Sequence, residues 1–431
     1  MRRLPKAVLR FVATEAAGGI CLLVAAMVAL AWANSPWGSS YDTFWSTDAT
    51  VGVGRWSLAL DLRHWVNDGL MALFFLVVGV EVKRELVTGE LRDRRAAAVP
   101  MVAALGGMVV PAAIYLALTA GSGGSAGWGI PMATDIAFAL GVLAVLGRRV
   151  PASLKLLLLT LAIVDDIGAV LVIALAYTSD LDPAALAVAL ALVVTIAAAR
   201  MARVPWLPIY GALAVATWVA VYASGVHATI AGVVIGLLVP TRPLAPAAVA
   251  REWAADLDED PSAEEVAALS RVARAAASPA ERIEQRLHPW TGFFVVPLFA
   301  LANAGIPITR SAFDAPGAGR VATAVAVALV GGKVVGITAA AWVVVRTGLG
   351  RLPDGVSWPQ LVGAAAVAGI GFTVSLFVTE LAFGTDPALA DAARLGVLGA
   401  SVCAALLGAA VLVLAARTRP EASPTPLDEV R

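Results

Sequence analysis

Long apolar runs recur along this sequence, and they constrain its fold more than any other feature. A helix needs about 20 consecutive apolar residues to cross the hydrocarbon core of a bilayer. Scanning the chain predicts about twelve such spans, of which the eighth is short and depends on a break at Gly225. Their approximate bounds are 11–33, 63–82, 96–119, 128–147, 152–176, 183–199, 206–223, 226–240, 290–308, 321–345, 358–382 and 393–416.

The composition agrees with an all-α polytopic membrane protein. Hydrophobic residues make up 60% of the chain and charged residues 14%, against roughly 45–50% and about 25% in soluble domains. We therefore expect one membrane domain over residues 1–431, with spans from about 11 to 416. The first apolar stretch follows a basic start but exceeds the ~7–15 apolar residues of a secretory signal, so we interpret it as an uncleaved first helix. The formal net charge is zero, which gives no indication of a nucleic-acid partner.

The distribution of basic residues predicts the orientation. Of the 31 Lys and Arg residues, Lys333 lies inside a span, and 25 of the others fall in alternate loops on one side. The opposite side has only the remaining five, which are Arg55, Arg63, Arg310, Arg320 and Arg394. Cytoplasmic loops of membrane proteins carry the excess of basic residues. Both termini are therefore predicted to be cytoplasmic.

Three segments outside the spans follow from this orientation. Residues 34–62 form an external loop with three tryptophans, which is either a small ordered element or a contact surface. Residues 241–288 form a cytoplasmic loop with an acidic patch and then a basic helical stretch, interpreted mainly as a solvated linker. Residues 417–431 form a cytoplasmic tail.

Several charged residues lie inside the predicted spans. Asp165 and Asp166 are adjacent in the fifth span, Asp135 lies in the fourth, Lys333 in the tenth, and Asp68 near the outer end of the second. A charge at the centre of a membrane helix costs at least about 2.5–3.5 kcal/mol, so each is a candidate functional residue.

The adjacent acids Asp165 and Asp166 suggest a cation or proton site. Two carboxylates so close together cannot both ionise cheaply in a low dielectric, so such a pair holds protons or sheds them and holds a cation. Carboxylate and carbonyl oxygens are the ligands that small hard cations prefer. The alternative is that the charges pair with one another and only lock the helices together.

The fourth and eleventh spans contain helix-breaking residues at membrane depth. Pro131 and Thr134 interrupt the fourth span, and the run 369–373 (GIGFT) interrupts the eleventh. Interrupted helices in corresponding positions of two halves point to a binding site of a transporter. We expect Asp135 to offset exposed N-terminal helix ends and Lys333 to offset exposed carbonyl ends. The alternative for the glycines is ordinary close packing of membrane helices.

The sequence gives no sign of an enzyme or of an ATP-driven pump. The segment around Lys333 lacks the glycine six residues before the lysine and the following Ser or Thr of a nucleotide-binding loop. An intramembrane aspartyl protease would need a G-x-G-D motif, which this sequence lacks. We therefore expect no cofactor and no ATP, and an ion gradient as the energy source.

Eight stretches together resemble the bacterial NhaA-type sodium/proton antiporters. They are FFLVVGVEVKREL (74–86), PMATDIAFALGVLA (131–144), LAIVDDIGAVLVIAL (161–175), SGVHATIAGVVIG (224–236), LHPW (287–290), ANAGI (302–306), GKVVGI (332–337) and GIGFTVSLF (369–377). The stretches run from the second span to the eleventh in the order of that family.

The resemblance implies a fold and a set of roles. The family has twelve helices in inverted repeats, with the fourth and eleventh discontinuous and crossing. It implies that Asp165 and Asp166 carry the cation and protons, and that Thr134, Asp135 and Lys333 balance the crossing. Residues that the resemblance associates with pH response are Glu81, Glu85, His227 and Glu284. It also implies a homodimer that forms through residues 34–62.

The sequence thus predicts a secondary antiporter in the bacterial inner membrane. It would export Na⁺ or Li⁺ in exchange for external protons by alternating access, electrogenically and under pH regulation. The main alternative is a sodium-coupled symporter of an organic anion on a related fold, for which an adjacent acid pair is a poor host. A transport-inactive sensor with the same fold is a further alternative.

Overall fold

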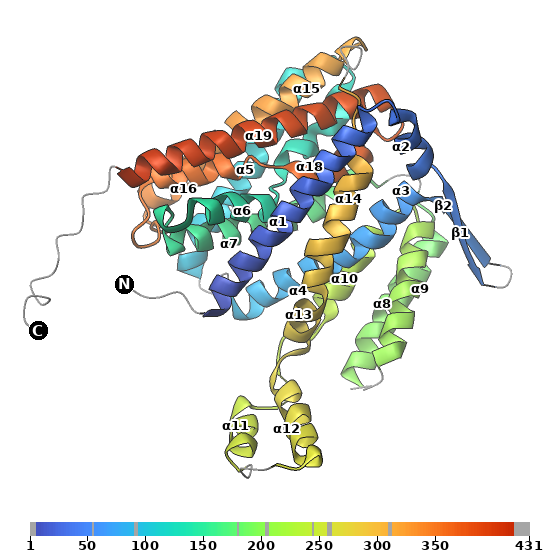
Figure 1. Ribbon diagram of the computed structural model, residues 1–431, viewed down its shortest axis with the longest axis vertical. Helices are drawn as coiled ribbons and strands as arrows, with labels where there is room; N and C mark the ends of the chain where they lie inside the picture. Colours follow the sequence, from blue (N-terminus) through green and yellow to red (C-terminus); the bar gives the residue numbers. More distant parts are fainter. Residues whose placement is uncertain are drawn as a thin grey trace, which may run out of the picture.

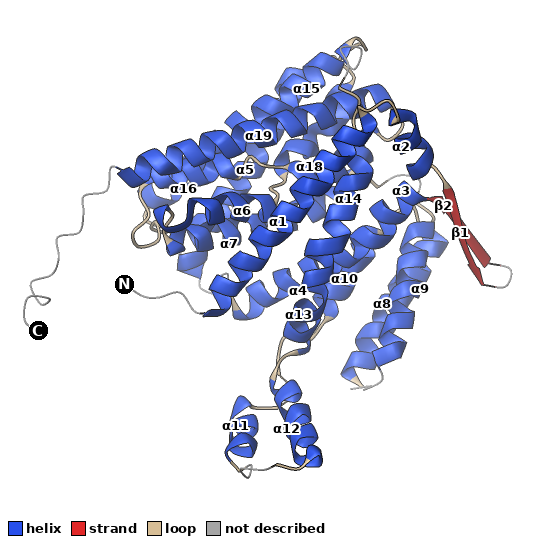
Figure 2. Cartoon of the chain, in the orientation of Figure 1, coloured by secondary structure: helices blue, strands red, loops and turns tan. Residues whose placement is uncertain are grey.

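The computed structural model is built almost wholly of helices (Figures 1 and 2). It describes residues 6–53, 56–89, 94–178, 181–202, 207–243, 245–256, 261–308 and 313–417. Most helices lie side by side in one bundle, which agrees with the all-α class predicted from the sequence. The predicted tail at 417–431 lies, after Arg417, outside the described residues.

Five helices within the described residues are long and apolar enough to cross a membrane on their own. Three of them lie in the first half of the chain: α5 (Arg94–Thr119), α7 (Ala152–Ala176) and α8 (Pro183–Met201). The other two are a continuous rod of α15 (Ala318–Val327), η7 (Ala328–Gly332) and α16 (Lys333–Arg346), and α19 (Pro387–Arg417).

Three further apolar helix pairs are bent by more than 40° at a short break. The helix α1 (Lys6–Ala33) turns by 115° into α2 (Gly38–Trp45). The 3₁₀ segment η3 (Gly124–Met132) meets α6 (Ile136–Leu146) at 43°, and α17 (Trp358–Val367) meets α18 (Phe372–Phe383) at 48°. These last two breaks fall where the sequence predicts interruptions.

The remaining helices of the bundle are shorter, and several are joined by π-helical turns. One chain of elements is α3 (Leu62–His64), η1 (Trp65–Leu70) and α4 (Met71–Thr88), and another is α13 (Pro279–Trp290), η5 (Thr291–Val295) and α14 (Val296–Asn303). The short apolar helices are α9 (Leu207–Ala223) and α10 (Thr229–Leu238), and a single 3₁₀ turn, η4 (Gly147–Arg149), follows α6.

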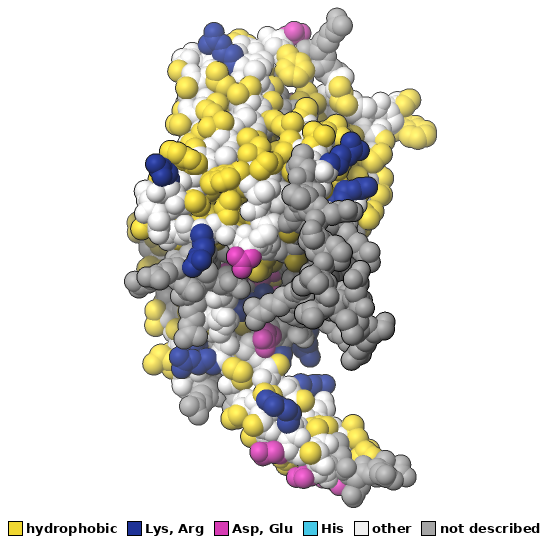
Figure 3. All heavy atoms as spheres, turned by 90° about the vertical axis from the view of Figure 1, so that its left-hand side faces the viewer, with side chains coloured by type: hydrophobic (Ala, Val, Ile, Leu, Met, Phe, Trp, Pro, Cys, Tyr) yellow, Lys and Arg dark blue, Asp and Glu magenta, His cyan; other side chains and the backbone are white. Residues whose placement is uncertain are grey.

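The described parts of the segment at 241–288 are largely helical, in agreement with the helical stretch predicted there. They form α11 (Ala247–Ala255), α12 (Ala263–Ala276) and α13, and the first two project from the bundle (Figure 1). Ser262 and Ser278 are the N-caps of α12 and α13, and each makes a capping box with a glutamate three residues later. Such boxes satisfy backbone N–H groups at a helix start. The projection carries Asp and Glu side chains on its surface (Figure 3).

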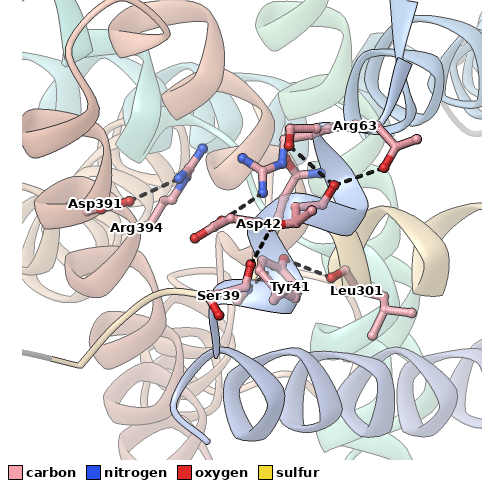
Figure 4. Close-up of polar contacts among 12 residues, drawn as sticks. Ser39, Tyr41, Asp42, Arg63, Leu301, Asp391 and Arg394 are labelled. Atoms are coloured by element: carbon pink, nitrogen blue, oxygen red, sulfur yellow. Dashed lines mark hydrogen bonds and ion pairs between the residues drawn. The ribbon is translucent and has the colours of Figure 1, made fainter. Parts of the chain in front are cut away.

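The external loop predicted at 34–62 contains α2 and an antiparallel hairpin of β1 (Asp48–Val53) and β2 (Trp56–Asp61). Tyr41 anchors α2, because its buried hydroxyl donates to the carbonyl of Leu301 over 2.9 Å and accepts from the N–H of Gly305 over 3.1 Å (Figure 4).

Ion pairs lie beside the anchor formed by Tyr41. Arg63 pairs with Asp42 at 3.5 Å, and Arg394 of α19 pairs with Asp391 at 3.0 Å (Figure 4). Arg394 also pairs with Glu380. The loop is therefore fixed to the bundle at its α2 end.

Small residues allow the helices that carry the charged residues to approach closely. A Cβ atom on Gly106 of α5 would lie 2.3 Å from the carbonyl oxygen of Gly336 on α16, and a Cβ on Gly336 would lie 2.2 Å from that of Gly106. Such pairs let the backbones of membrane helices touch. This contact places Lys333, one turn before Gly336, against the centre of the bundle.

The face of the bundle in Figure 3 carries many exposed apolar side chains. The side chains of Met27, Val109 and Leu406 are 61%, 62% and 68% exposed. Soluble monomers rarely expose contiguous apolar patches of this kind. Together with the long apolar helices, this surface is that of a membrane protein.

Candidate functional site

The two broken helices meet at their breaks. The backbone N–H of Asp135, between η3 and α6, donates to the carbonyl of Ile370, between α17 and α18, over 2.7 Å. The hydroxyl of Thr134 lies 2.9 Å from the carbonyl oxygen of Ala368 and 2.8 Å from Oδ2 of Asp165, and these two acceptors share its single proton. Backbone groups freed by a break need partners when water is excluded, and here each break supplies partners for the other.

Asp135 accepts hydrogen bonds from the N-terminal ends of two helices. Its Oδ1 accepts from the N–H of Phe138 in the first turn of α6 over 3.0 Å. Its Oδ2 accepts from the N–H of Thr373 at the start of α18 over 3.1 Å and from the Thr373 hydroxyl over 2.6 Å. Helix N-termini carry partial positive charge, which a carboxylate offsets. One buried side chain therefore caps both half-helices.

Lys333 binds a C-terminal helix end, where carbonyl oxygens are exposed. Its Nζ donates to the carbonyl of Met132, the last residue of η3, over 2.6 Å, and to the hydroxyl of Thr134 over 3.0 Å. The same nitrogen lies 2.6 Å from Oδ2 of Asp165 on α7. Lys333 and Asp165 are both fully buried. A buried ammonium of this kind needs charged and hydrogen-bonding partners to offset its loss of solvation.

A close backbone approach places Lys333 beside the second break. A Cβ atom on Gly369, in the turn between α17 and α18, would lie 2.5 Å from the carbonyl oxygen of Leu329 in η7. A residue with a side chain at position 369 would therefore push the break away from η7. The glycine holds η7, and with it Lys333, next to the contact between the breaks.

The two adjacent aspartates have different surroundings. Asp165 has its Oδ2 bound by Lys333 and by the Thr134 hydroxyl at 2.8 Å, whereas its buried Oδ1 has no hydrogen-bond partner within the described part of the chain. Asp166 is 7% exposed and lines a pocket. The pair therefore has one carboxylate locked in a buried ion pair and one that a pocket reaches.

That pocket connects several of the predicted residues. It is lined by parts of α1, α4, α6, α7, α18 and the η5 turn, and Glu81, Asp135 and Thr373 contribute to its wall together with Asp166. Most of the other lining side chains are apolar. The pocket leads to the carboxylate of Asp166 and to the ends of both half-helices.

One turn after Thr373, an aromatic ring of α18 packs against rings of α4 and α14. The ring of Phe377 lies 5.5 Å from that of Phe75 on α4 and 6.2 Å from that of Phe299 on α14, measured between centroids. All three rings are at most 3% exposed. None of them is among the residues that line the pocket.

The residues associated with pH response lie on three parts of the chain: α4, α13 and the connection between α9 and α10. Glu81 lies in the pocket wall. Glu284 of α13 pairs with Arg84 of α4, with 2.7 and 2.6 Å between guanidinium and carboxylate atoms. Burial raises the pKa of the Glu284 carboxyl above its ordinary value, although the nearby Arg84 opposes this shift. Glu85 lies one turn after Glu81 on α4 and does not line the pocket.

His227 lies apart from the pocket, in the connection between α9 and α10. Its Nε2 is 2.6 Å from the backbone carbonyl of Tyr177, which accepts the hydrogen bond because a carbonyl cannot donate. His227 therefore contacts the end of the helix that carries the two acids.

Three contributors to the site did not emerge from the sequence. Arg84 is one of several basic residues at the end of its span, so its partner Glu284 could not be recognised. The carbonyl of Met132 leaves no trace in a sequence because every residue has one. Tyr177 lies just after an apolar run and resembles an ordinary interfacial aromatic.

The fold and the site together indicate the class of membrane protein to which this chain belongs. A helical membrane protein with two contacting helix breaks and buried acids at the contact has the features of a secondary transporter. The family model described as Na⁺/H⁺ antiporter 1 matches residues 9–412. The chain belongs to this family.

Many curated relatives match nearly the full length. A protein of Frankia alni named Na(+)/H(+) antiporter NhaA 3 is 49% identical over 98% of this chain and 92% of its own length. Proteins named Na(+)/H(+) antiporter NhaA are 46% identical in Rhodopirellula baltica, over 94% of this chain and 93% of theirs, and 45% identical in Rhizobium meliloti, over 96% and 95%. These relatives are transporters, not enzymes.

Proposed function

We propose that this protein exports Na⁺, or Li⁺, in exchange for protons, with Asp165 and Asp166 as the shared binding site. Membership of the Na⁺/H⁺ antiporter family over nearly the whole chain supports the exchange of these two ions. The observation that carries the site is the divided acid pair: Asp165 held by Lys333, and Asp166 open to a pocket.

Competition for the same oxygens couples the two ions. A cation would reach Asp166 through the pocket. The neighbouring residue, Asp165, offers a second oxygen, because its Oδ1 has no hydrogen-bond partner among the described residues. Binding there adds positive charge beside Lys333 and Asp165, so protons leave the site as the cation enters. Two carboxylates so close cannot both stay ionised without a cation. Exchange therefore needs no separate coupling device.

We propose that the acid pair is exposed to the two sides of the membrane in turn. In this conformation the pocket reaches Asp166, and the rings of Phe75, Phe299 and Phe377 pack together outside its lining. We infer that the halves of the broken helices cross within a bundle of twelve spans built as inverted repeats, the architecture that the family resemblance implies. Movement of the crossed helices would then expose the acid pair to the other side.

The direction and charge of the cycle would follow from its stoichiometry. If two protons exchange for one sodium ion, each cycle moves one net charge and responds to the membrane potential. Proton entry then drives sodium export. Regulation by pH would act through Glu81, Glu85, Glu284 and His227. Glu81 lines the pocket, Glu284 joins α13 to α4 through Arg84, and His227 contacts the end of α7.

We propose the bacterial inner membrane as the location, with both termini in the cytoplasm. The excess of basic residues in alternate loops supports this orientation.

We also propose a homodimer that forms through residues 34–62. The β1–β2 hairpin projects from the bundle (Figure 1), and an isolated two-stranded hairpin is only marginally stable in water. A second copy of the chain would supply the missing partner surface. Deleting the hairpin should convert a dimer in detergent to a monomer, as measured by light scattering.

The alternative, a sodium-coupled symporter of an organic anion, gains no support from the relatives, whose names specify Na⁺ and H⁺. An anionic substrate would also have to approach two acids.

Everted vesicles provide the direct test of the proposed site. Asp166→Asn should abolish sodium-dependent proton exchange, because the amide no longer ionises. Asp391→Asn is the matched control, since this acid also lies on a membrane helix but pairs with Arg394 and does not line the pocket. Retained exchange in Asp166→Asn would refute the assignment.

A further inference from the structure

Tyr177 joins three segments around the site through one side chain and one carbonyl. It is the C-terminal cap of α7, the helix that carries the acid pair. Its hydroxyl donates to the carbonyl of Ala126 over 2.9 Å and accepts from the N–H of Gly129 over 3.2 Å. Both partners belong to η3, the 3₁₀ half of the first broken helix. Its own carbonyl accepts from His227 over 2.6 Å.

The fit between Tyr177 and η3 is tight. A Cβ atom on Gly129 would lie 2.8 Å from the Tyr177 hydroxyl oxygen and 3.1 Å from a ring carbon. Any larger residue at position 129 would therefore displace either the ring or η3. The tyrosine thus sets the distance between the end of α7 and this half-helix.

The segment held by Tyr177 leads directly to the charged contact. Gly129 is three residues, or one 3₁₀ turn of about 6 Å, from Met132. The Met132 carbonyl accepts from Lys333, and Thr134 donates to Asp165 two residues later. A shift of η3 at Gly129 therefore reaches the groups that hold Lys333 and Asp165 together.

We propose that Tyr177 is a positioning residue of the exchange site. Its hydroxyl fixes η3 relative to α7 so that Met132 and Thr134 meet Lys333 and Asp165 in one geometry. Binding sites must be held within about 0.5 Å of their productive geometry to keep their affinity. The inference rests on the proposed function, because it assigns Tyr177 to the same acid pair.

Tyr177→Phe removes both hydroxyl bonds and keeps the ring. Tyr115→Phe is the matched control, because the Tyr115 hydroxyl donates to the carbonyl of Gly124 over 2.7 Å, at the far end of the same η3 segment. Both variants lose a hydroxyl that makes hydrogen bonds, which is buried in Tyr115 and partly exposed in Tyr177, and both should melt at lower temperature. A change in melting alone therefore does not distinguish positioning from a structural role.

The deciding readout is sodium affinity, measured by calorimetry on purified protein and as the half-saturating sodium concentration in vesicles. Tyr177→Phe should weaken sodium affinity by about threefold or more, and more than it lowers the maximal rate, because displaced ligands cost binding. Tyr115→Phe should leave affinity near that of the unaltered protein. Equal sodium affinities in the two variants would overturn the positioning role.

A second pair of variants keeps the test decisive if Tyr177→Phe does not accumulate. Gly129→Ala forces the same contact apart from the η3 side, whereas Gly141→Ala on α6 places a Cβ where nothing lies within 4 Å. Gly129→Ala should weaken sodium binding and Gly141→Ala should not; equal affinities would contradict the proposal. Unaltered protein that exchanges no sodium for protons would instead refute the proposed function.

Discussion

The ammonium nitrogen of Lys333 lies 2.6 Å from Oδ2 of Asp165, with both side chains fully buried. This ion pair joins the rod that contains α16 to the acid-bearing helix α7, and the Met132 carbonyl extends it to the first broken helix. The pair therefore links structure and transport, because the carboxylate that stabilises the bundle is also one of the two proposed to take up the cation.

Lys333→Ala tests the structural side of this pair. Removing one partner leaves the Asp165 carboxylate buried without its counter-charge, which typically costs about 3–5 kcal/mol. We expect a clearly lower melting temperature and an altered pH dependence of exchange. Lys155→Ala is the control, because Lys155 lies in the first turn of α7 and is only partly buried. Unchanged melting and unchanged transport in Lys333→Ala would show that the charge is incidental.

Asp135→Asn tests the double cap. An asparagine keeps one acceptor oxygen but loses the charge that faces two helix N-termini, and such charge–dipole contacts are worth up to about 2 kcal/mol when partly buried. Asp182→Asn is the matched control, because Asp182 caps the single helix α8 at an exposed position and Asn is an equally good cap there. Thermal unfolding should show a loss for Asp135→Asn well above that for Asp182→Asn. Equal losses would refute the double role.

Gly369→Ala tests the contact between the second break and η7. The added methyl would lie 2.5 Å from the carbonyl oxygen of Leu329, and overpacking of this kind costs about 1–3 kcal/mol. Gly331→Ala, within η7 itself, meets nothing within 4 Å and should be tolerated. We expect reduced exchange and a lower melting temperature only for Gly369→Ala. Equal behaviour of the two variants would mean that the close approach is not required.

Glu284→Gln tests the α4–α13 pair through pH. Because burial raises the pKa of Glu284 in the folded protein above its ordinary value of 4.5, the folded state holds this proton more tightly than the unfolded chain does. Stability from this group is therefore present below the ordinary pKa and is lost as the pH rises through the raised value.

The melting temperature of the unaltered protein should accordingly fall relative to that of Glu284→Gln as the pH rises above about 4.5, since glutamine stays neutral. Thermal unfolding of both proteins across a pH series checks this. A difference that stays constant with pH, or that changes in the opposite direction, would contradict the expected ionisation.

The sequence predicted the helical membrane class and the interrupted spans because both leave local signals. Apolar runs of span length mark helices, and Pro131 and the glycines around Ile370 mark the breaks. The residue types of the acid pair and of Lys333 also stand out, because charges are costly in a membrane. The sequence did not predict that Lys333 pairs with Asp165 rather than with Asp166 or Asp135, since that choice depends on packing between distant helices.

Other features could not be predicted for the same physical reason. Tyr177 acts through hydrogen bonds to backbone atoms of η3, and such partners have no sequence signature. The π-helical turn η7 before Lys333 gives no signal of its own in an apolar run. The starts of α12 and α13 do have a local signal, because Ser262 and Ser278 are each followed three residues later by a glutamate.

The central claim is that sodium and protons compete for one acid pair. Calorimetry of sodium binding to the purified protein, in buffers of different ionisation enthalpy and over a range of pH, counts the protons released per ion bound. The account predicts that sodium binding releases protons and that Asp166→Asn loses this release. Sodium binding without proton release at any pH would contradict it.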